Sequence, residues 1–135
     1  MNARYGRSPV VLVVHGHHAV RRALCERIRA SFANFQVLEA SAIDDALYMV
    51  EAEHIDVVLI DGEGSGINGL KGTRAILERA PTTSVIVMSS HGEPAGSSAA
   101  SAGAMAFVSK RAIGSELMQV LQDLMKEREA KQRGR

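Results

Sequence analysis

The sequence is poor in cysteine, in net charge and in long apolar runs, and each shortage excludes a class of protein. A single cysteine, Cys25, excludes an internal disulfide and a thiolate metal cage. A formal net charge of +1, with acids and bases interspersed, argues against direct nucleic-acid binding. No stretch approaches the roughly 20 apolar residues that cross a bilayer, and residues 1–10 hold no apolar run typical of a secretory signal. We therefore expect a cytoplasmic protein without a membrane segment, in which Cys25 is a buried apolar residue.

The length and the apolar content fit one folded domain. A chain of 135 residues with 46% hydrophobic residues can fill a single core, and there is no room for a second domain of ordinary size. We expect the domain to span residues 8–126, with flexible termini at 1–7 and 127–135.

Five short apolar runs, each bounded by turn residues, predict five strands. The runs VVLVV, VVLI and VIVM are rich in Val and Ile and do not alternate with polar residues. This composition is typical of strands that are covered on both faces, and such strands form parallel sheets. The predicted strands are Val10–Val14, Phe35–Glu39, Asp56–Ile60, Ser84–Met88 and Met105–Val108.

The segments between the strands have apolar residues at helical spacing, so strand and helix alternate along the chain. Ser41 and Asp44 resemble a capping box at the start of the second helix. The fourth helix, within Gly92–Ala104, is expected to be short because its residues are nearly all small. This alternation predicts an α/β fold with helices on both faces of an open sheet. In such folds the ligand crevice lies beyond the carboxyl ends of the strands.

Chemically active side chains follow four of the predicted strands. Taken alone, each has an ordinary explanation, since Asp often forms turns, Ser often caps and Lys is usually solvated. Together they place an acid, an amine and hydroxyls at one edge of the sheet. The residues in question are His15 and Gly16 after the first strand, Asp61 after the third, Ser89 and Ser90 after the fourth, and Ser109 and Lys110 after the fifth.

The arrangement resembles the receiver domains of two-component response regulators, over about Val10 to Leu124. The segments that carry the resemblance are DVVLIDGEGSGINGL, VIVMSS and AGAMAFVSK. It implies a three-layer, doubly wound (βα)5 fold of the flavodoxin-like type, with all strands parallel in the order 2-1-3-4-5. It also implies a signalling module rather than an enzyme. The implied roles are phosphoacceptor for Asp61, phosphoryl contacts for Ser89 and Lys110, and aromatic switch for Phe107.

The sequence departs from this family after the first strand. Family members carry two acidic residues there, which hold the Mg²⁺ ion used in phosphoryl transfer, whereas this chain has His15 and Gly16. Mg²⁺ prefers oxygen ligands in octahedral geometry and is poorly served by imidazole. We therefore expect no cofactor and weak or absent Mg²⁺ binding. Because Asp61 and Lys110 neutralise each other, charge balance does not require the metal, but its Lewis-acid help is lost.

Two smaller departures concern the loop after Asp61 and the switch aromatic. The family pattern has a bulky residue and a proline where this chain reads Gly64, Ser65 and Gly66, so we expect a less preorganised loop. Phe107 lacks the hydroxyl of a tyrosine, which favours inward packing.

The histidines offer another interpretation, a transition-metal site. Zinc, nickel and copper accept imidazole and carboxylate ligands. Because adjacent histidines should point apart, we favour surface imidazoles, with the first helix opening at His17 and His18. The candidate ligands are His15, His17, His18, His91 and Asp61.

Two functions remain open. In the first, the chain is a degenerate receiver that binds a protein partner in trans, or its own copy, through the face formed by the fourth helix, the fifth strand and the last helix. In the second, a histidine kinase or phosphotransfer protein phosphorylates Asp61. The missing acids favour the first, and the retained Asp61, Ser89 and Lys110 favour descent from the second.

Overall fold

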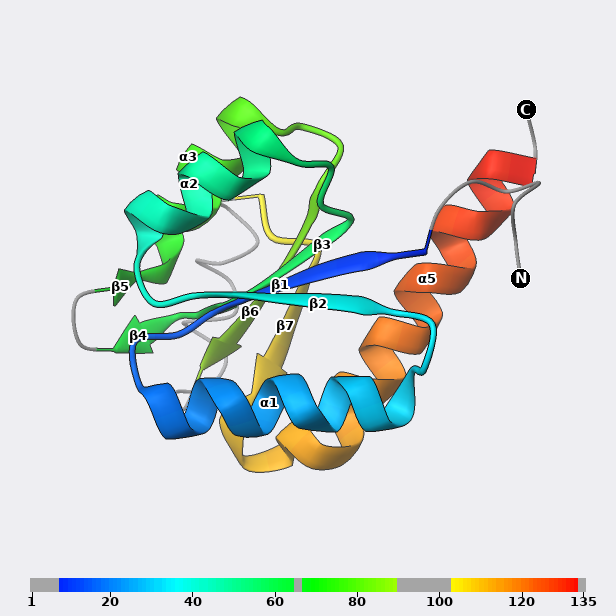
Figure 1. The fold of residues 1–135 in the computed structure, drawn as a ribbon, viewed down its shortest axis with the longest axis horizontal. Helices are drawn as coiled ribbons and strands as arrows, with labels where there is room; N and C mark the ends of the chain where they lie inside the picture. The colour runs from blue at the N-terminus through cyan, green and yellow to red at the C-terminus, as the bar shows by residue number, and fades with distance from the viewer. Residues whose placement is uncertain (1–7, 65–66, 90–102, 134–135) are drawn as a thin grey trace.

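The computed structural model describes residues 8–64, 67–89 and 103–133. Its centre is a five-stranded parallel sheet in the order β2-β1-β3-β6-β7, which confirms the predicted order 2-1-3-4-5 (Figure 1). Every predicted strand is present, with ends that differ by at most one residue. The strands are β1 (Val10–Val14), β2 (Gln36–Ala40), β3 (Val57–Asp61), β6 (Ser84–Ser89) and β7 (Ala106–Ser109).

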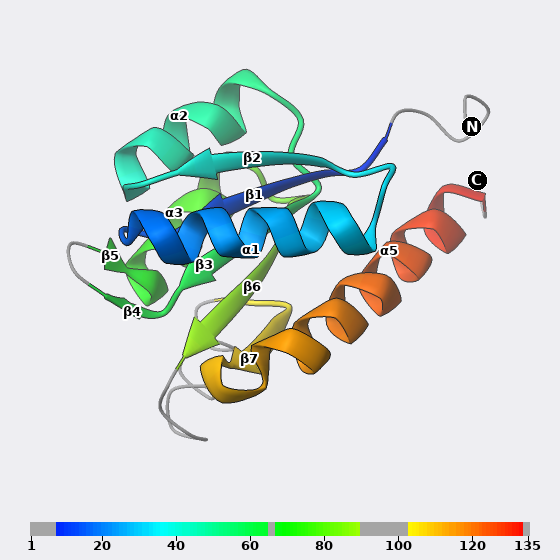
Figure 2. The same ribbon diagram turned by 60° about the horizontal axis from the view of Figure 1, so that its bottom comes forward.

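Helices cover both faces of this sheet, as Figures 1 and 2 show. Helices α2 (Ile43–Ala52) and α3 (Gly69–Arg79) lie on one face, and α1 (His18–Ser31) and α5 (Met118–Arg133) on the other. A 3-10 turn, η2 (Lys110–Ala112), and a π-helical turn, η3 (Ile113–Leu117), join β7 to α5. The short helix predicted within Gly92–Ala104 lies outside the described residues, except for its last two positions.

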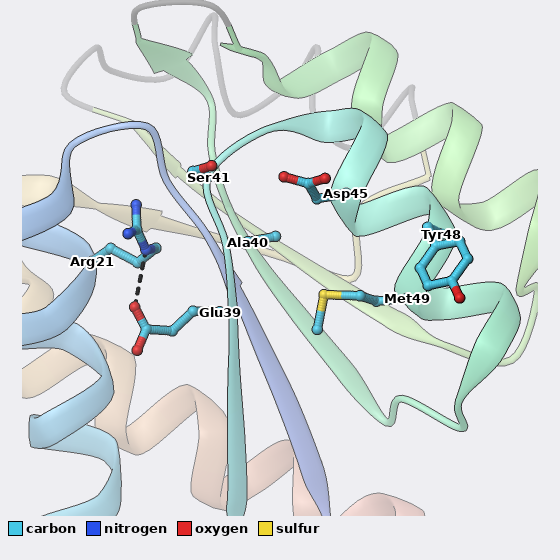
Figure 3. Close-up of a pocket in the computed structure, with 7 residues that line it drawn as sticks. All are labelled: Arg21, Glu39, Ala40, Ser41, Asp45, Tyr48 and Met49. Carbon is cyan, nitrogen blue, oxygen red and sulfur yellow. Dashed lines mark hydrogen bonds and ion pairs between the residues drawn. The ribbon is translucent and has the colours of Figure 1, made fainter.

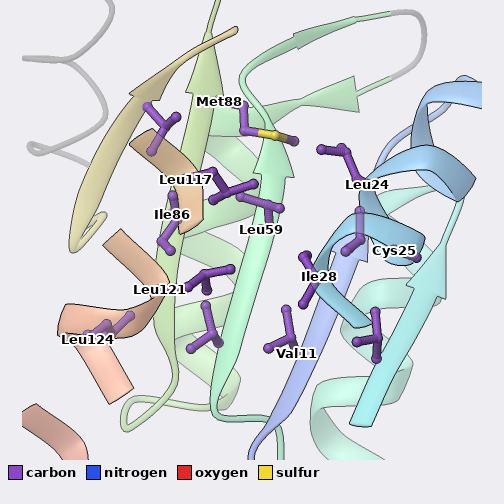
Figure 4. Packing of buried hydrophobic residues seen from close by; sticks show 14 residues of the cluster. Val11, Leu24, Cys25, Ile28, Leu59, Ile86, Met88, Leu117, Leu121 and Leu124 are labelled. Atoms are coloured by element: carbon purple, nitrogen blue, oxygen red, sulfur yellow. The ribbon is translucent and has the colours of Figure 1, made fainter. Parts of the chain in front are cut away.

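The side chains of successive residues in the central strands point alternately into two separate hydrophobic cores. Val11 and Val13 face α1 and α5, in a core that includes Ile28 and Leu121 (Figure 4), whereas Leu12 faces α2 and α3. Burial of each such side chain stabilises the fold by about 1.5–3 kcal/mol. Because both faces are buried, the strands need apolar residues at every position, which explains the unbroken runs in the sequence.

Cys25 belongs to the core between α1 and the sheet (Figure 4). It is fully buried, as expected. Burial raises the pKa of its thiol to about 11, so the thiol is protonated at neutral pH. Cys25 therefore packs as a small apolar side chain.

The starts of the first two helices differ in how well the sequence predicted them. His17 caps α1, since its Nδ1 accepts the N–H of Val20 at 3.3 Å. The prediction of a capping box at Ser41 and Asp44 is wrong, because the N-cap residue of α2 is Ala42, which makes no side-chain cap bond. The acidic residues in the first turn of α2 still suit the positive end of the helix dipole.

A buried carboxylate ties α5 to the amino-terminal edge of the sheet. Asp56 Oδ2 accepts the N–H of Val10 at 2.8 Å, and its Oδ1 accepts from His54 Nε2 at 3.0 Å and from Arg128 Nη2 at 3.3 Å. Arg128 Nη1 also donates to Ser84 Oγ at 3.0 Å. Helix α5 thus continues, held by side-chain bonds, past residue 126, where we predicted a flexible terminus to begin. The domain limits themselves stay a prediction.

Replacing Arg128 should destabilise the fold. Arg128→Gln removes the charged donor from the buried Asp56 carboxylate and should lower the free energy of unfolding by about 1–3 kcal/mol. Urea denaturation followed by circular dichroism measures this change. Lys126→Gln, at an exposed position two residues earlier, is the matched control and should change the free energy by no more than about 0.5 kcal/mol. Equal effects of the two variants would contradict the role assigned to Arg128.

Candidate functional site

Three side chains meet at the carboxyl edge of the sheet. Lys110 Nζ lies 2.5 Å from Asp61 Oδ1, and His15 Nε2 lies 3.6 Å from Asp61 Oδ2. They come from separate elements: His15 follows β1, Asp61 ends β3, and Lys110 begins η2 directly after β7. The convergence predicted from the strand ends is therefore present. We call this group the His15–Asp61–Lys110 cluster.

Two further predicted residues lie on the strands beside the cluster. Ser89 ends β6, is 1% exposed, and follows Met88, which is in register with Asp61. Phe107 lies in β7 in register with Val87 and is partly exposed, outside both core clusters. Ser89 is thus buried at the end of the neighbouring strand, whereas Phe107 lies two residues before the end of β7.

Gly16, His17 and His18 do not join the cluster. Gly16 and His17 are exposed, and His17 caps α1. His18 is also exposed, and its Nδ1 lies 3.0 Å from Arg21 Nη2. His91 and Ser90 lie outside the described residues.

Burial and neighbouring charges favour the neutral form of His15. The residue is 9% exposed. Burial lowers the pKa of His15 below its ordinary value of 6.5; Asp61 opposes this change, and Lys110 and Arg21 reinforce it. With a neutral imidazole, the carboxylate of Asp61 and the ammonium of Lys110 give the cluster a net charge of zero.

Arg21 fixes the loop that carries His15, and sequence reasoning missed it. Its Nη1 donates to the backbone oxygen of His15 at 2.9 Å, and its Nε donates to Glu39 Oε1 at 2.9 Å (Figure 3). Arg22 binds the other oxygen of Glu39. Burial tends to raise the pKa of Glu39, but the bonds and charges of Arg22 and Arg21 outweigh it and lower that pKa.

An open pocket of about 370 Å³ lies beside this ion pair, between α1 and α2. Asp45, Tyr48 and Met49 of α2 line its other wall (Figure 3). Tyr48 is 72% exposed. Arg21 and Glu39 thus link the loop of His15 to an accessible surface.

The loop after Asp61 contains a short antiparallel hairpin, β4 (Glu63–Gly64) and β5 (Ile67–Asn68). Gly69 begins α3 so close to the end of β3 that a Cβ there would lie 2.6 Å from Gly62 Cα and 2.7 Å from Asp61 O. Asn68 caps α3 by accepting the N–H groups of Leu70 and Lys71. The close approach at Gly69 fixes the direction in which the chain leaves Asp61.

The turn after β7 positions Lys110. Ser109 N–H donates to Glu116 Oε1 at 3.0 Å, and Ser109 Oγ accepts the N–H of Arg111 at 3.2 Å. The backbone on both sides of Lys110 is therefore held. Next to it, an apolar cavity of about 350 Å³ opens between α1 and η3, lined in part by Val20, Leu24 and Met88.

The residues of the cluster do not match the ligand set that Mg²⁺ prefers. They contribute one carboxylate, whose oxygens face Lys110 and His15, whereas Mg²⁺ favours octahedral oxygen ligands at about 2.1 Å. Within residues 8–64, 67–89 and 103–133, no group of three His, Cys, Asp or Glu could hold a metal ion.

No helix in the described part of the chain is long and apolar enough to cross a membrane.

Removing the amine of Lys110 should destabilise the fold through Asp61. Asp61 is 2% exposed, so Lys110→Met leaves an uncompensated buried carboxylate and should lower the free energy of unfolding by about 3 kcal/mol. The double variant Asp61→Asn/Lys110→Met should recover most of this loss, since no charge is then left unpaired. Urea titrations of the two single variants and the double variant measure the coupling. A coupling free energy near zero would contradict the ion pair.

Stability should also fall at mildly acidic pH because of His15. Its pKa is lower in the folded protein than its ordinary value of 6.5, so the unfolded chain binds more protons as the pH falls through this value. The contribution is fully present above pH 6.5 and is lost below it. In denaturation curves from about pH 7 to about pH 5, His15→Gln should lose less stability than the parent protein. Lys126→Gln, at an exposed position of α5, should behave as the parent does; a parent-like pH profile for His15→Gln would refute the assignment.

Comparison with known proteins identifies the family. The family model of the response regulator receiver domain matches residues 11–122. Response regulator UvrY of Escherichia coli O6:H1 is 33% identical over 116 residues, which cover 84% of this chain and 53% of that protein. The chain thus spans about half the length of the curated relatives it matches.

Solved structures agree with this result. A LuxR family DNA-binding response regulator from Silicibacter pomeroyi is 26% identical, with a TM-score of 0.76 over 88% of this chain and 93% of that one. A CheY-like receiver domain protein from Methanospirillum hungatei JF-1, 18% identical, shares the fold with a TM-score of 0.76 over 94% of this chain and 98% of that one. This chain belongs to the response regulator receiver domain family of two-component systems.

Proposed function

We propose that this chain is an atypical receiver that signals through protein contact, with Mg²⁺-dependent phosphorylation of Asp61 impaired or absent. The observation that carries the proposal is the composition of the His15–Asp61–Lys110 cluster. One carboxylate is already neutralised by an ammonium group at 2.5 Å, and an imidazole stands where family members carry acidic residues. This ligand set is expected to bind Mg²⁺ weakly or not at all.

The energetic consequence for phosphoryl transfer is large. If a bound divalent cation lowers the barrier by about 3–4 kcal/mol, its loss slows the transfer about a hundredfold to a thousandfold. Lys110 can stabilise one developing negative charge on the transferred group, but a neutral His15 adds no second positive charge. Phosphorylation would then be too slow to serve as the main signal.

Two surfaces support action through contact. The apolar cavity beside Lys110 is open to a partner, and Val20 on its wall is 41% exposed. At the edge of the sheet, Met105 is 57% exposed and Phe107 of β7 is partly exposed. The second surface is the described part, β7 and α5, of the face predicted for the fourth helix, the fifth strand and the last helix, and we propose that a protein partner or a second copy binds there.

The remaining features of the proposal follow from the same family membership and from composition. We propose a cytoplasmic module that acts without enzymatic turnover, without a cofactor, and without direct contact to nucleic acid or membrane. The near-neutral charge of the chain supports the absence of nucleic-acid binding.

A phosphoacceptor function is the second candidate, and the contact of Lys110 with Asp61 favours it. A buried carboxylate at a strand end, with an ammonium group at 2.5 Å and the buried Ser89 on the next strand, keeps the groups that would accept a phosphoryl group and bind its oxygens. In that case a histidine kinase or phosphotransfer protein donates to Asp61, Ser89 and Lys110 contact the phosphoryl oxygens, and Phe107 reports the change.

Incubation with acetyl phosphate distinguishes the two functions. The protein is incubated with and without Mg²⁺, and intact mass is then measured for the parent, Asp61→Asn and Asp45→Asn, the last being an exposed-carboxylate control. We expect no phosphoryl adduct above the level of Asp61→Asn, with or without Mg²⁺. A rapid adduct on the parent and on Asp45→Asn that depends on Mg²⁺ and disappears in Asp61→Asn would overturn the contact proposal in favour of the phosphoacceptor.

A further inference from the structure

The imidazole of His15 is held in one tautomer by the backbone. Its Nδ1 accepts the N–H of His17 at 3.0 Å, so Nδ1 cannot carry a hydrogen. In a neutral ring the hydrogen must then lie on Nε2, the nitrogen that faces Asp61 Oδ2 at 3.6 Å. The ring therefore presents an N–H group, and not a lone pair, to the buried carboxylate.

The loop geometry also resists protonation of this ring. A second hydrogen would have to be placed on Nδ1, where it would meet the N–H of His17, another donor. The ring is 9% exposed, so water cannot replace that bond easily. The charge of Asp61 favours the protonated ring and raises its pKa, whereas Lys110, His17 and Arg21 lower it. Hydrogen bonding and burial thus favour the same neutral form.

Each oxygen of Asp61 consequently faces an N–H group of the protein itself, although His15 lies just beyond hydrogen-bond distance. Lys110 lies at Oδ1 and His15 at Oδ2. A magnesium ion bound to Oδ2 would need an octahedral shell of oxygens around it, in the space where the imidazole lies. The partial positive charge of an N–H group would in addition repel the ion.

We propose that the neutral imidazole of His15, with its Nε2–H directed toward Asp61, occupies the space beside this carboxylate and excludes Mg²⁺ from it. His15 is not a catalytic residue: it acts on Asp61, by filling the space beside the carboxylate and polarising it. The inference goes beyond the proposed function, since it concerns what occupies the site whether or not Asp61 accepts a phosphoryl group.

The loop can accept a carboxylate in place of the imidazole. The carboxylate of an aspartate can accept the N–H of the residue two positions later, as His15 Nδ1 does from His17. Arg21 binds the backbone oxygen of residue 15, so this bond does not depend on the side chain. His15→Asp should therefore fold, remove the blocking N–H group and add an oxygen ligand.

Mg²⁺ titration of four proteins tests the proposal. Mg²⁺ is added to the parent, His15→Asp, His15→Asn and Gln122→Asp, and the amide signal of Gly62 is followed by NMR. We expect His15→Asp to bind at least about tenfold more tightly than the parent, because it gains a carboxylate beside Asp61. His15→Asn removes the ring and its N–H without adding charge, so it should also bind Mg²⁺ more tightly than the parent, by a smaller factor of about threefold. Gln122→Asp adds the same charge at an exposed position of α5 and should resemble the parent.

Two outcomes of the titration contradict the proposal. One is a parent protein that binds Mg²⁺ as tightly as His15→Asp. The other is a folded His15→Asn, by its amide spectrum, that binds Mg²⁺ no more tightly than the parent, since His15 would then not be what excludes the ion. If acetyl phosphate labels Asp61 while the parent still binds Mg²⁺ weakly, the contact function fails and this inference stands.

The tautomer gives an independent measurement on the unmodified protein. Long-range ¹H–¹⁵N spectra of the imidazole at pH 7 should show a neutral ring with its hydrogen on Nε2 of His15. A hydrogen on Nδ1, or a doubly protonated ring, would contradict the proposal whatever the metal affinity.

Discussion

The buried carboxylate of Asp61 is the constraint on which this edge of the molecule depends. A charge that is 2% exposed is stable only when it is paired, and the ammonium group of Lys110 provides the partner. Lys110 directly follows the last residue of β7, and β6 lies between β7 and β3 in the sheet. The long lysine side chain reaches across that gap, so the order of three strands and the charge balance of the site are linked. A shift in the register of β7 would break the ion pair.

Much of this arrangement could be predicted from the sequence because the strands are covered on both faces. Runs such as Val10–Val14 have apolar residues at every position, so their limits are visible without knowledge of their neighbours. In a parallel sheet every strand ends at the same edge, which is why His15, Asp61 and Lys110 could be grouped before their distances were known. The predicted ends differed by one residue at most: β3, for example, extends to Asp61 because that residue still pairs with Met88.

Contacts between elements distant in sequence were not predictable in the same way. Arg21 reaches Glu39 and the backbone of His15, and Arg128 reaches Asp56, which is 72 positions away. Each pair depends on how a helix is rotated against the sheet, and a hydrophobic pattern fixes only which stripe of the helix is buried. The tautomer of His15 could not be predicted either, because it is set by the backbone N–H of His17 in an irregular loop.

The single cysteine gives this fold an internal reporter. Cys25 is fully buried between α1 and the sheet, and its thiol is protonated at neutral pH, so two separate barriers protect it from alkylation. An alkylating reagent can react only when α1 separates from the sheet and the sulfur ionises. The rate of labelling in native buffer thus measures how often the layer that carries the His15 loop opens, with no engineered probe in the chain.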